Sequence, residues 1–67
     1  MKIVDARGLS CPEPVMLTEA ALKEGGGPVK VLVTEPHQRM NVEKYAKDHG
    51  RKAVSEETED GFAVVIG

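Results

Sequence analysis

The hydrophobic positions of this sequence follow two periods, which divide the chain into strand-like and helix-like segments. In segment 29–34 every second residue is valine, which predicts a strand with one apolar face and a second face that is partly apolar. Three other stretches are predicted to be strands as well: 2–6, 51–58 and 62–66. The last two are joined through Asp60-Gly61, a dipeptide that is favoured in tight hairpins.

Two longer segments carry their apolar residues at helical spacing. The first helix is predicted to begin within segment 11–14, Cys-Pro-Glu-Pro, because Pro12 suits the first helical position, where its φ is helical and its missing N–H loses no partner. The glycine run 25–27 is predicted to end this helix. Met16 falls on the exposed side of the helix. The predicted packed face contains Pro14, Val15, Leu17, Thr18, Ala21 and Leu22.

The second helix has a clear body and an open start. Its body follows the spacing i, i+3, i+4 and i+7 with Val42, Tyr45, Ala46 and His49. Gly50 suits the position just past its end. Either Pro36 at a first helical position or Asn41 as a cap could begin it. The predicted element order is therefore βαβαββ.

The composition fits one small domain with an aliphatic core. A chain of 67 residues buries roughly 60% of its unfolded surface, which allows one modest core. Only Tyr45 and Phe62 are aromatic, so the core must consist mainly of Val, Ile, Leu, Met and Ala. A single cysteine cannot form an intramolecular disulfide, and the two histidines have no cysteine beside them in the sequence. We therefore expect no metal site and a fold that packing alone stabilises.

The charge pattern disfavours two classes of partner. A formal net charge of −2 provides no cationic field, so we expect no direct binding of nucleic acid. The N-terminal residues include charges where a signal peptide is apolar, and the longest purely apolar run, 62–66, is too short to cross a bilayer. We expect no membrane partner and a cytoplasmic location, where an unpaired cysteine is easily kept reduced.

Cys11 is the candidate nucleophile, because it falls at or next to the predicted cap of the first helix. A helix N-terminus stabilises negative charge, and the thiolate is the reactive form of cysteine. Pro12 would hold the cysteine at the helix entrance. The carboxylate of Glu13 opposes a nearby thiolate, and Arg7 could offset it. The alternative is that Cys11 is a small buried hydrophobic residue, as lone cysteines often are.

The absence of a second cysteine disfavours a dithiol redox enzyme, because Cys11 has no internal thiol with which to form a disulfide. The sequence does not place His37 or His49 near Cys11, so a Cys–His catalytic pair is disfavoured. The glycine run follows a helix and lacks a Gly-Lys-Ser/Thr ending, which makes it a linker rather than a phosphate loop. The acidic stretch 56–60 is interpreted as a solvated surface, with steering of a basic partner as the alternative.

Residues 5–16, Asp-Ala-Arg-Gly-Leu-Ser-Cys-Pro-Glu-Pro-Val-Met, resemble the N-terminal motif of the TusA/SirA/YedF family. That motif is Asp, two residues, Gly-Leu, one residue, then Cys-Pro-x-Pro and an apolar residue. The resemblance covers the whole chain, because length, element order and the closing hairpin agree with the single domain of the family. It implies one domain over residues 1–67 with an α+β fold. This fold is a two-layer α/β sandwich, βαβαββ, with two helices on one face of a four-stranded mixed sheet.

The resemblance also implies sulfur trafficking. The family cysteine, which matches Cys11, accepts sulfane sulfur as a persulfide from a cysteine desulfurase or another donor protein and relays it to an acceptor protein, without a cofactor. Family members serve tRNA thiolation, molybdenum-cofactor supply, dissimilatory sulfur metabolism and selenium-associated operons. By this resemblance the chain is a sulfurtransferase-type carrier; whether it acts as an enzyme stays open. The site would be shaped by Pro12, Pro14 and Gly8, with Arg7 and Glu13 for charge balance and partner contact.

A departure from TusA members occurs in segment 35–42. Glu35-Pro36 keeps the acidic residue and proline that follow the second strand, but Asn41-Val42 stands where many members have Asp-Ile, which is closer to the YedF-like subgroup. The alternative function is a regulatory or protein-interaction domain, including one associated with selenium metabolism, in which the thiol is dispensable. The sequence leaves open the donor, the acceptor, sulfur versus selenium, the oligomeric state, and whether the chain is one domain of a longer protein.

Overall fold

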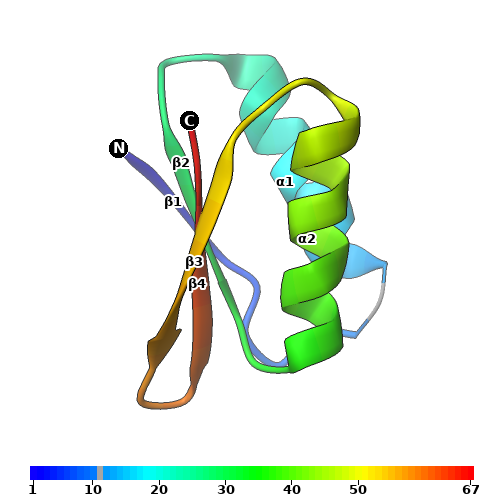
Figure 1. Cartoon of the computed structure of the whole chain (residues 1–67), viewed down its shortest axis with the longest axis vertical. Coiled ribbons are helices and arrows are strands. Elements are labelled where there is room, and N and C mark those ends of the chain that lie inside the picture. Colours follow the sequence, from blue (N-terminus) through cyan, green and yellow to red (C-terminus); the bar gives the residue numbers. More distant parts are fainter. Residues whose placement is uncertain (11) are drawn as a thin grey trace.

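The structure, a computed structural model, describes residues 1–10 and 12–67, so Cys11 lies outside the described residues. Along the chain the elements are β1 (Lys2–Asp5), α1 (Glu13–Glu24), β2 (Val29–Val33), α2 (Pro36–Asp48), β3 (Ala53–Thr58) and β4 (Gly61–Ile66). The predicted order βαβαββ is confirmed, and each observed strand ends within two residues of its predicted bounds (Figure 1).

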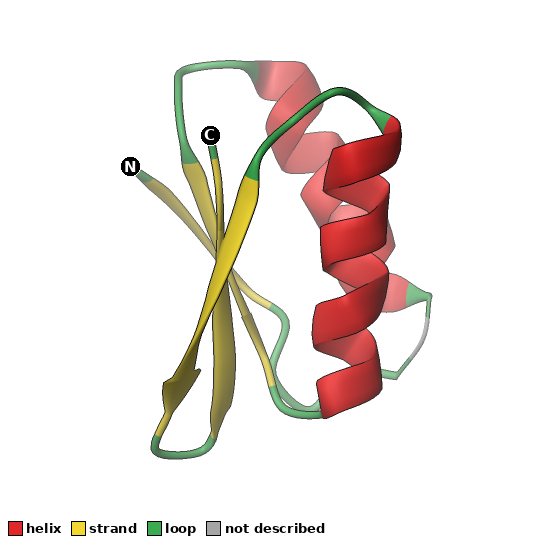
Figure 2. Cartoon of the chain, viewed as in Figure 1, coloured by secondary structure: helices red, strands yellow, loops and turns green. Residues whose placement is uncertain are grey.

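The four strands form one mixed sheet in the order β1-β2-β4-β3. β1 and β2 are parallel, so the connection between them must cross over the sheet, and α1 makes that crossing. β4 is antiparallel to both β2 and β3. Figure 2 shows both helices on one face of the sheet and no helix on the other. The predicted α+β sandwich with two helices on one face is therefore confirmed.

The core lies between the helices and the central strands. Val29, Val31 and Val33 of β2 are at most 1% exposed, as the period-2 pattern predicts, and Val64 and Ile66 of β4 lie beside them. The helices contribute Ala21, Val42 and Ala46 to this cluster. Because β2 and β4 are the two central strands, their apolar residues form the surface of the sheet against which both helices pack.

The start of α1 differs by one residue from the prediction. Pro12 is the cap residue rather than the first helical residue, and the helix begins at Glu13. The cause is a turn before the helix, in which the Glu13 N–H donates to the Ser10 carbonyl over 2.9 Å. The first helical bond then runs from the Met16 N–H to the Pro12 carbonyl over 3.1 Å.

The packed face of α1 is narrower than predicted. Pro14, Thr18 and Ala21 are buried, and Val15 and Leu22 are partly buried against the core, as predicted. Leu17 is 39% exposed and so does not belong to the packed face. The Thr18 hydroxyl turns back into the helix and donates to the Pro14 carbonyl over 2.8 Å, which lets this polar residue lie against the sheet. Met16 is 61% exposed, as predicted.

The open question about α2 is settled in favour of Pro36, which is its first residue, with Glu35 as the cap. Gln38 is buried at the third helical position, where its side-chain oxygen accepts the Glu35 N–H over 3.3 Å. Of the four residues at helical spacing, Val42 and Ala46 are buried, whereas His49 lies just past the last helical residue, Asp48. His49 caps the C-terminus of α2, is exposed, and stacks on Tyr45 with a 4.1 Å separation of the ring centres.

No helix within residues 1–10 and 12–67 has the length and apolar character needed to span a membrane.

Candidate functional site

The connection from β1 to α1, which carries the cysteine motif, lies at the end of the molecule where both helices begin, at the bottom of Figure 1. The β2–α2 connection and the β3–β4 turn lie at the same end (Figure 1). The topology explains this placement. β1 and β2 are parallel, so their carboxyl ends meet at one edge of the sheet, and the antiparallel β4 begins there with Phe62 opposite Val33.

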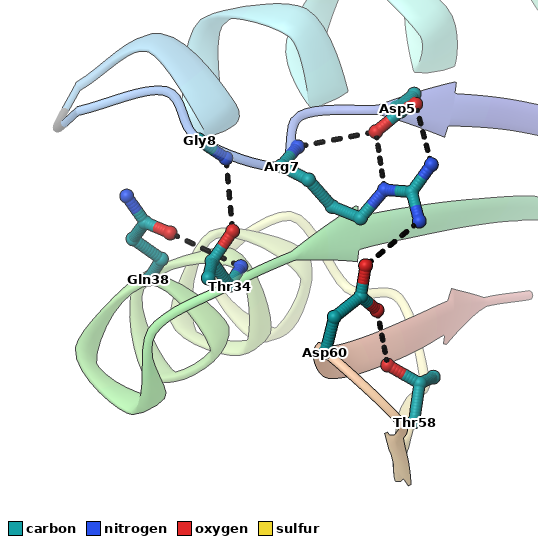
Figure 3. A network of polar contacts seen from close by, with 7 residues as sticks. All are labelled: Asp5, Arg7, Gly8, Thr34, Gln38, Thr58 and Asp60. Atoms are coloured by element: carbon teal, nitrogen blue, oxygen red, sulfur yellow. Dashed lines mark hydrogen bonds and ion pairs between the residues drawn. The ribbon is translucent and has the colours of Figure 1, made fainter.

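Arg7 is held by two carboxylates at this edge (Figure 3). Its Nε and Nη2 atoms each lie 2.9 Å from an oxygen of Asp5, and its Nη1 lies 3.0 Å from Asp60 in the β3–β4 turn. Asp60 in turn accepts the hydroxyl of Thr58 over 3.3 Å. The guanidinium therefore ties the start of the motif to a turn 53 residues further along the chain.

The same contacts set the electrostatics of the Arg7 pair. Hydrogen bonds from the Arg7 side chain, and then from its backbone N–H, lower the pKa of Asp5 from its ordinary value of 3.8 to about 2. The Asp5 carboxylate raises the pKa of Arg7 further above its already high value. Because two carboxylates, those of Asp5 and Asp60, already pair with the single positive charge of Arg7, the clearest structural effect of Arg7 is to anchor the loop that leads to the cysteine.

The loop after Arg7 is fastened to the β2–α2 connection. Gly8 has a φ of 78°, a left-handed conformation that glycine adopts without strain, and its N–H donates to the Thr34 hydroxyl over 2.8 Å (Figure 3). The carbonyl of the next residue, Leu9, accepts a hydrogen bond from the Nε2 of Gln38. Gly8, one of the predicted site-shaping residues, thus makes the bend that brings the loop against α2.

The remaining predicted site residues surround the entrance to α1. Pro12 and Glu13 are exposed, while Pro14 is buried in the first turn. Cys11 lies outside the described residues, so its side chain is not placed. Two residues after Cys11, Glu13 lines an open cavity of about 240 Å³ with Leu9, Met16 and Leu17. This cavity offers an apolar surface with one carboxylate at the helix start.

Sequence reasoning missed two residues of this region, His37 and Gln38. A second cavity, of about 350 Å³, lies on the α2 side of the loop and is lined by both of them, together with Gly8, Leu9 and Ser10. His37 is thus brought beside the loop, whereas His49 is at the other end of α2. Gln38 had a signal: once Pro36 is taken as the first helical residue, it occupies the position of the acid or amide in a capping box. For His37 no spacing in the sequence indicated its place.

Comparison with known proteins decides the family. The family model described as "Sulfurtransferase TusA" matches residues 2–67 of this chain. The chain belongs to the TusA family. The sulfur carrier protein TusA of Pseudomonas syringae pv. syringae is 38% identical over 60 residues, which are 87% of this chain and 71% of that protein. The sulfur carrier protein TusA of Pseudomonas aeruginosa PAO1 is 38% identical over 61 residues, 88% of this chain and 77% of that protein.

A solved structure agrees with this membership of the TusA family. The crystal structure of a SirA-like protein from Desulfitobacterium hafniense superimposes with a TM-score of 0.89 at 36% sequence identity. The match covers 98% of this chain and 93% of that chain. The family resemblance drawn from residues 5–16 and the fold it implied are both confirmed.

Proposed function

We propose that this protein is a sulfur carrier that holds sulfane sulfur as a persulfide on Cys11 and relays it between two proteins. The observation that carries the proposal is the place of its one cysteine. In a chain of the TusA family, Cys11 directly precedes the cap residue of α1, within the Cys-Pro-Glu-Pro segment. TusA relatives from two Pseudomonas species are named sulfur carrier proteins, which supports the same role here.

The chemistry of loading requires a thiolate at Cys11. This thiolate attacks the terminal sulfur of a persulfide on the donor; a bond forms from the Cys11 sulfur to that atom, and the donor's own sulfur–sulfur bond breaks. The donor cysteine leaves as a thiolate, and the proton stays on the transferred sulfur, so no oxidant is consumed. The positive end of α1 favours the attacking thiolate, whereas the carboxylate of Glu13, the first helical residue, opposes it.

Loading from the donor and transfer to the acceptor each need a protein partner that can approach the start of α1. Met16 and Leu17 are 61% and 39% exposed there, and with Leu9 they line the apolar cavity next to Glu13. Exposed apolar side chains of this kind are typical of contact surfaces, and methionine adapts to different partners. We propose this surface as the docking site for a cysteine desulfurase or another persulfide donor, and for the acceptor protein.

The other site residues support the loop and the helix entrance. Pro12 and Pro14 restrict the backbone on either side of Glu13, Gly8 makes the bend, and Arg7 anchors it. A cytoplasmic location belongs to the same proposal, because a single exchangeable thiol is most easily kept reduced there. Thiolation of tRNA through a relay of sulfur carriers is one pathway that this role would serve.

The test is to incubate the protein with a cysteine desulfurase and cysteine and to measure its intact mass. We expect the gain of one sulfur atom in the wild type and no gain in Cys11→Ser. If the wild type stays unmodified with several desulfurases, or if Cys11→Ser gains the same mass, the carrier function is wrong. Full retention of cellular function by Cys11→Ser would instead favour an interaction domain in which the thiol is dispensable.

A further inference from the structure

We infer that Gln38 is a positioning residue for sulfur transfer: its side chain holds the backbone before Cys11 in the orientation that a protein partner requires. This inference rests on the proposed carrier function and adds to it a residue outside the cysteine motif. Gln38 belongs to α2, and its bond to Leu9 joins residues that are 29 positions apart.

The hydrogen bonds of Gln38 use both ends of its amide. The Nε2 donates to the carbonyl of Leu9, two residues before Cys11. The Oε1 accepts backbone N–H groups of Thr34, over 3.4 Å, and Glu35, over 3.3 Å. Gln38 is only 4% exposed, so each of these bonds is shielded from water, and losing one would leave a buried polar group without a partner.

A cap for α2 would need only the oxygen of this side chain. A glutamate at the same helical position supplies that oxygen equally well in a capping box. The side-chain nitrogen has a separate role, because it donates to the loop that precedes the cysteine and not to the helix itself. The amide therefore connects the first turn of α2 rigidly to the backbone of Leu9.

A second contact, from the β2–α2 connection, holds the residue before Leu9. The Thr34 hydroxyl accepts the Gly8 N–H. Two successive residues of the loop are therefore held through their backbone, Gly8 by Thr34 and Leu9 by Gln38 of α2. A further hydrogen bond spans the cysteine in sequence, since the Ser10 carbonyl accepts the Glu13 N–H over 2.9 Å. The backbone before Cys11 is thus hydrogen-bonded to α2 through Leu9 and to the start of α1 through Ser10.

Fixing the loop before Cys11 matters for the reaction of Cys11 with a protein partner and much less for its reaction with a small reagent. A donor protein brings its persulfide on its own framework, so the two sulfur atoms must meet in line while both surfaces are docked. A small alkylating reagent can approach a thiolate from many directions. A positioning role therefore predicts that loss of the Gln38–Leu9 bond slows the first reaction and spares the second.

The experiment compares wild type with Gln38→Met, which has no side-chain group that hydrogen-bonds strongly, and Gln38→Glu, which keeps a capping oxygen but replaces the amide NH₂ group that donates to Leu9. The rate of sulfur loading from a cysteine desulfurase, followed by intact mass, should fall roughly tenfold or more in both variants. The rate of alkylation of Cys11 by iodoacetamide, measured at high pH where the thiol is ionised, should stay within threefold of wild type.

Val42→Ala is the matched control, because Val42 lies one turn further along α2, is fully buried, and has an aliphatic side chain that takes no part in the hydrogen bonds of the loop. It should lower the melting temperature and leave loading within threefold of wild type at a temperature where every variant is folded. Unchanged loading in both Gln38 variants, an equal loss of loading in Val42→Ala, or a parallel loss of alkylation would overturn the positioning role while leaving the carrier function intact. Failure of the wild type to load would overturn the carrier function and this inference with it.

Discussion

Replacing Gly61 with alanine should destabilise the fold, because β4 begins in direct contact with the backbone at the end of β2. A Cβ atom built on Gly61 overlaps the carbonyl oxygen of Val33 and lies 3.1 Å from the carbonyl carbon of that residue. It also lies 2.8 Å from the Cα of Thr34. All three atoms belong to the backbone, so no side chain can turn aside to make room.

The size of the effect follows from this overlap. Carbon atoms in ordinary contact are about 3.5 to 4.0 Å apart, so the strands would have to separate locally by about 1 Å. Overpacking of this kind costs about 1 to 3 kcal/mol of unfolding free energy, and we expect about 3 kcal/mol because only backbone can yield. A chain of this length has a total stability of roughly 3 to 10 kcal/mol, so the loss is a large share of it.

Urea unfolding followed by circular dichroism measures the change, and thermal melting gives an independent value. At about 4 to 8 °C for each kcal/mol, Gly61→Ala should melt roughly 12 to 24 °C below wild type. Gly67→Ala is the control, since nothing lies within 4 Å of a Cβ at Gly67. It should stay within about 0.5 kcal/mol of wild type.

A Gly61→Ala protein as stable as the control would refute this reasoning, because it would mean that β2 and β4 do not approach so closely at this end. The site depends on the same contact. The residue after Val33 is Thr34, whose hydroxyl accepts the Gly8 N–H, so a displaced β2 end would also loosen the loop that leads to Cys11.

Two further predictions concern the surface of the site. Met16→Asp should leave the unfolding free energy within about 1 kcal/mol of wild type while slowing sulfur loading from a desulfurase several-fold; a large loss of stability in urea would show instead that Met16 is packed in the core. Because Arg7 lowers the pKa of Asp5 from 3.8 to about 2, the stability that Asp5 contributes is present above pH 4 and is lost as the pH falls towards 2. The stability difference between wild type and Asp5→Asn, measured by urea unfolding, should therefore narrow between pH 5 and pH 2, and a constant difference over that range would contradict the role of the Arg7–Asp5 pair.

Local patterns in the sequence were sufficient to predict the elements and their order. Alternating valines predicted β2, helical spacing predicted the bodies of α1 and α2, and Asp60-Gly61 predicted the final hairpin, because each signal lies within a few consecutive residues. The motif around Cys11 likewise identified the family, since the motif is a run of neighbouring residues.

The ends of the helices and the residues of their packed faces were harder to predict from the sequence, because both depend on what each helix packs against. Leu17 has the right spacing for the packed face of α1, yet the buried stripe follows Pro14, Thr18 and Ala21. The start of α2 at Pro36 became clear only with Gln38, whose amide is satisfied by contacts inside and outside the helix.

Only the tertiary structure decided which distant residues surround the cysteine motif. The parallel pairing of β1 with β2 brings Thr34 of the β2–α2 connection, and Gln38 in the first turn of α2, to the loop at Gly8 and Leu9. The antiparallel return of β4 brings Asp60 to Arg7. The physical reason is that these hydrogen bonds join residues 26 to 53 positions apart, and strand order, which no local pattern encodes, determines which of them meet.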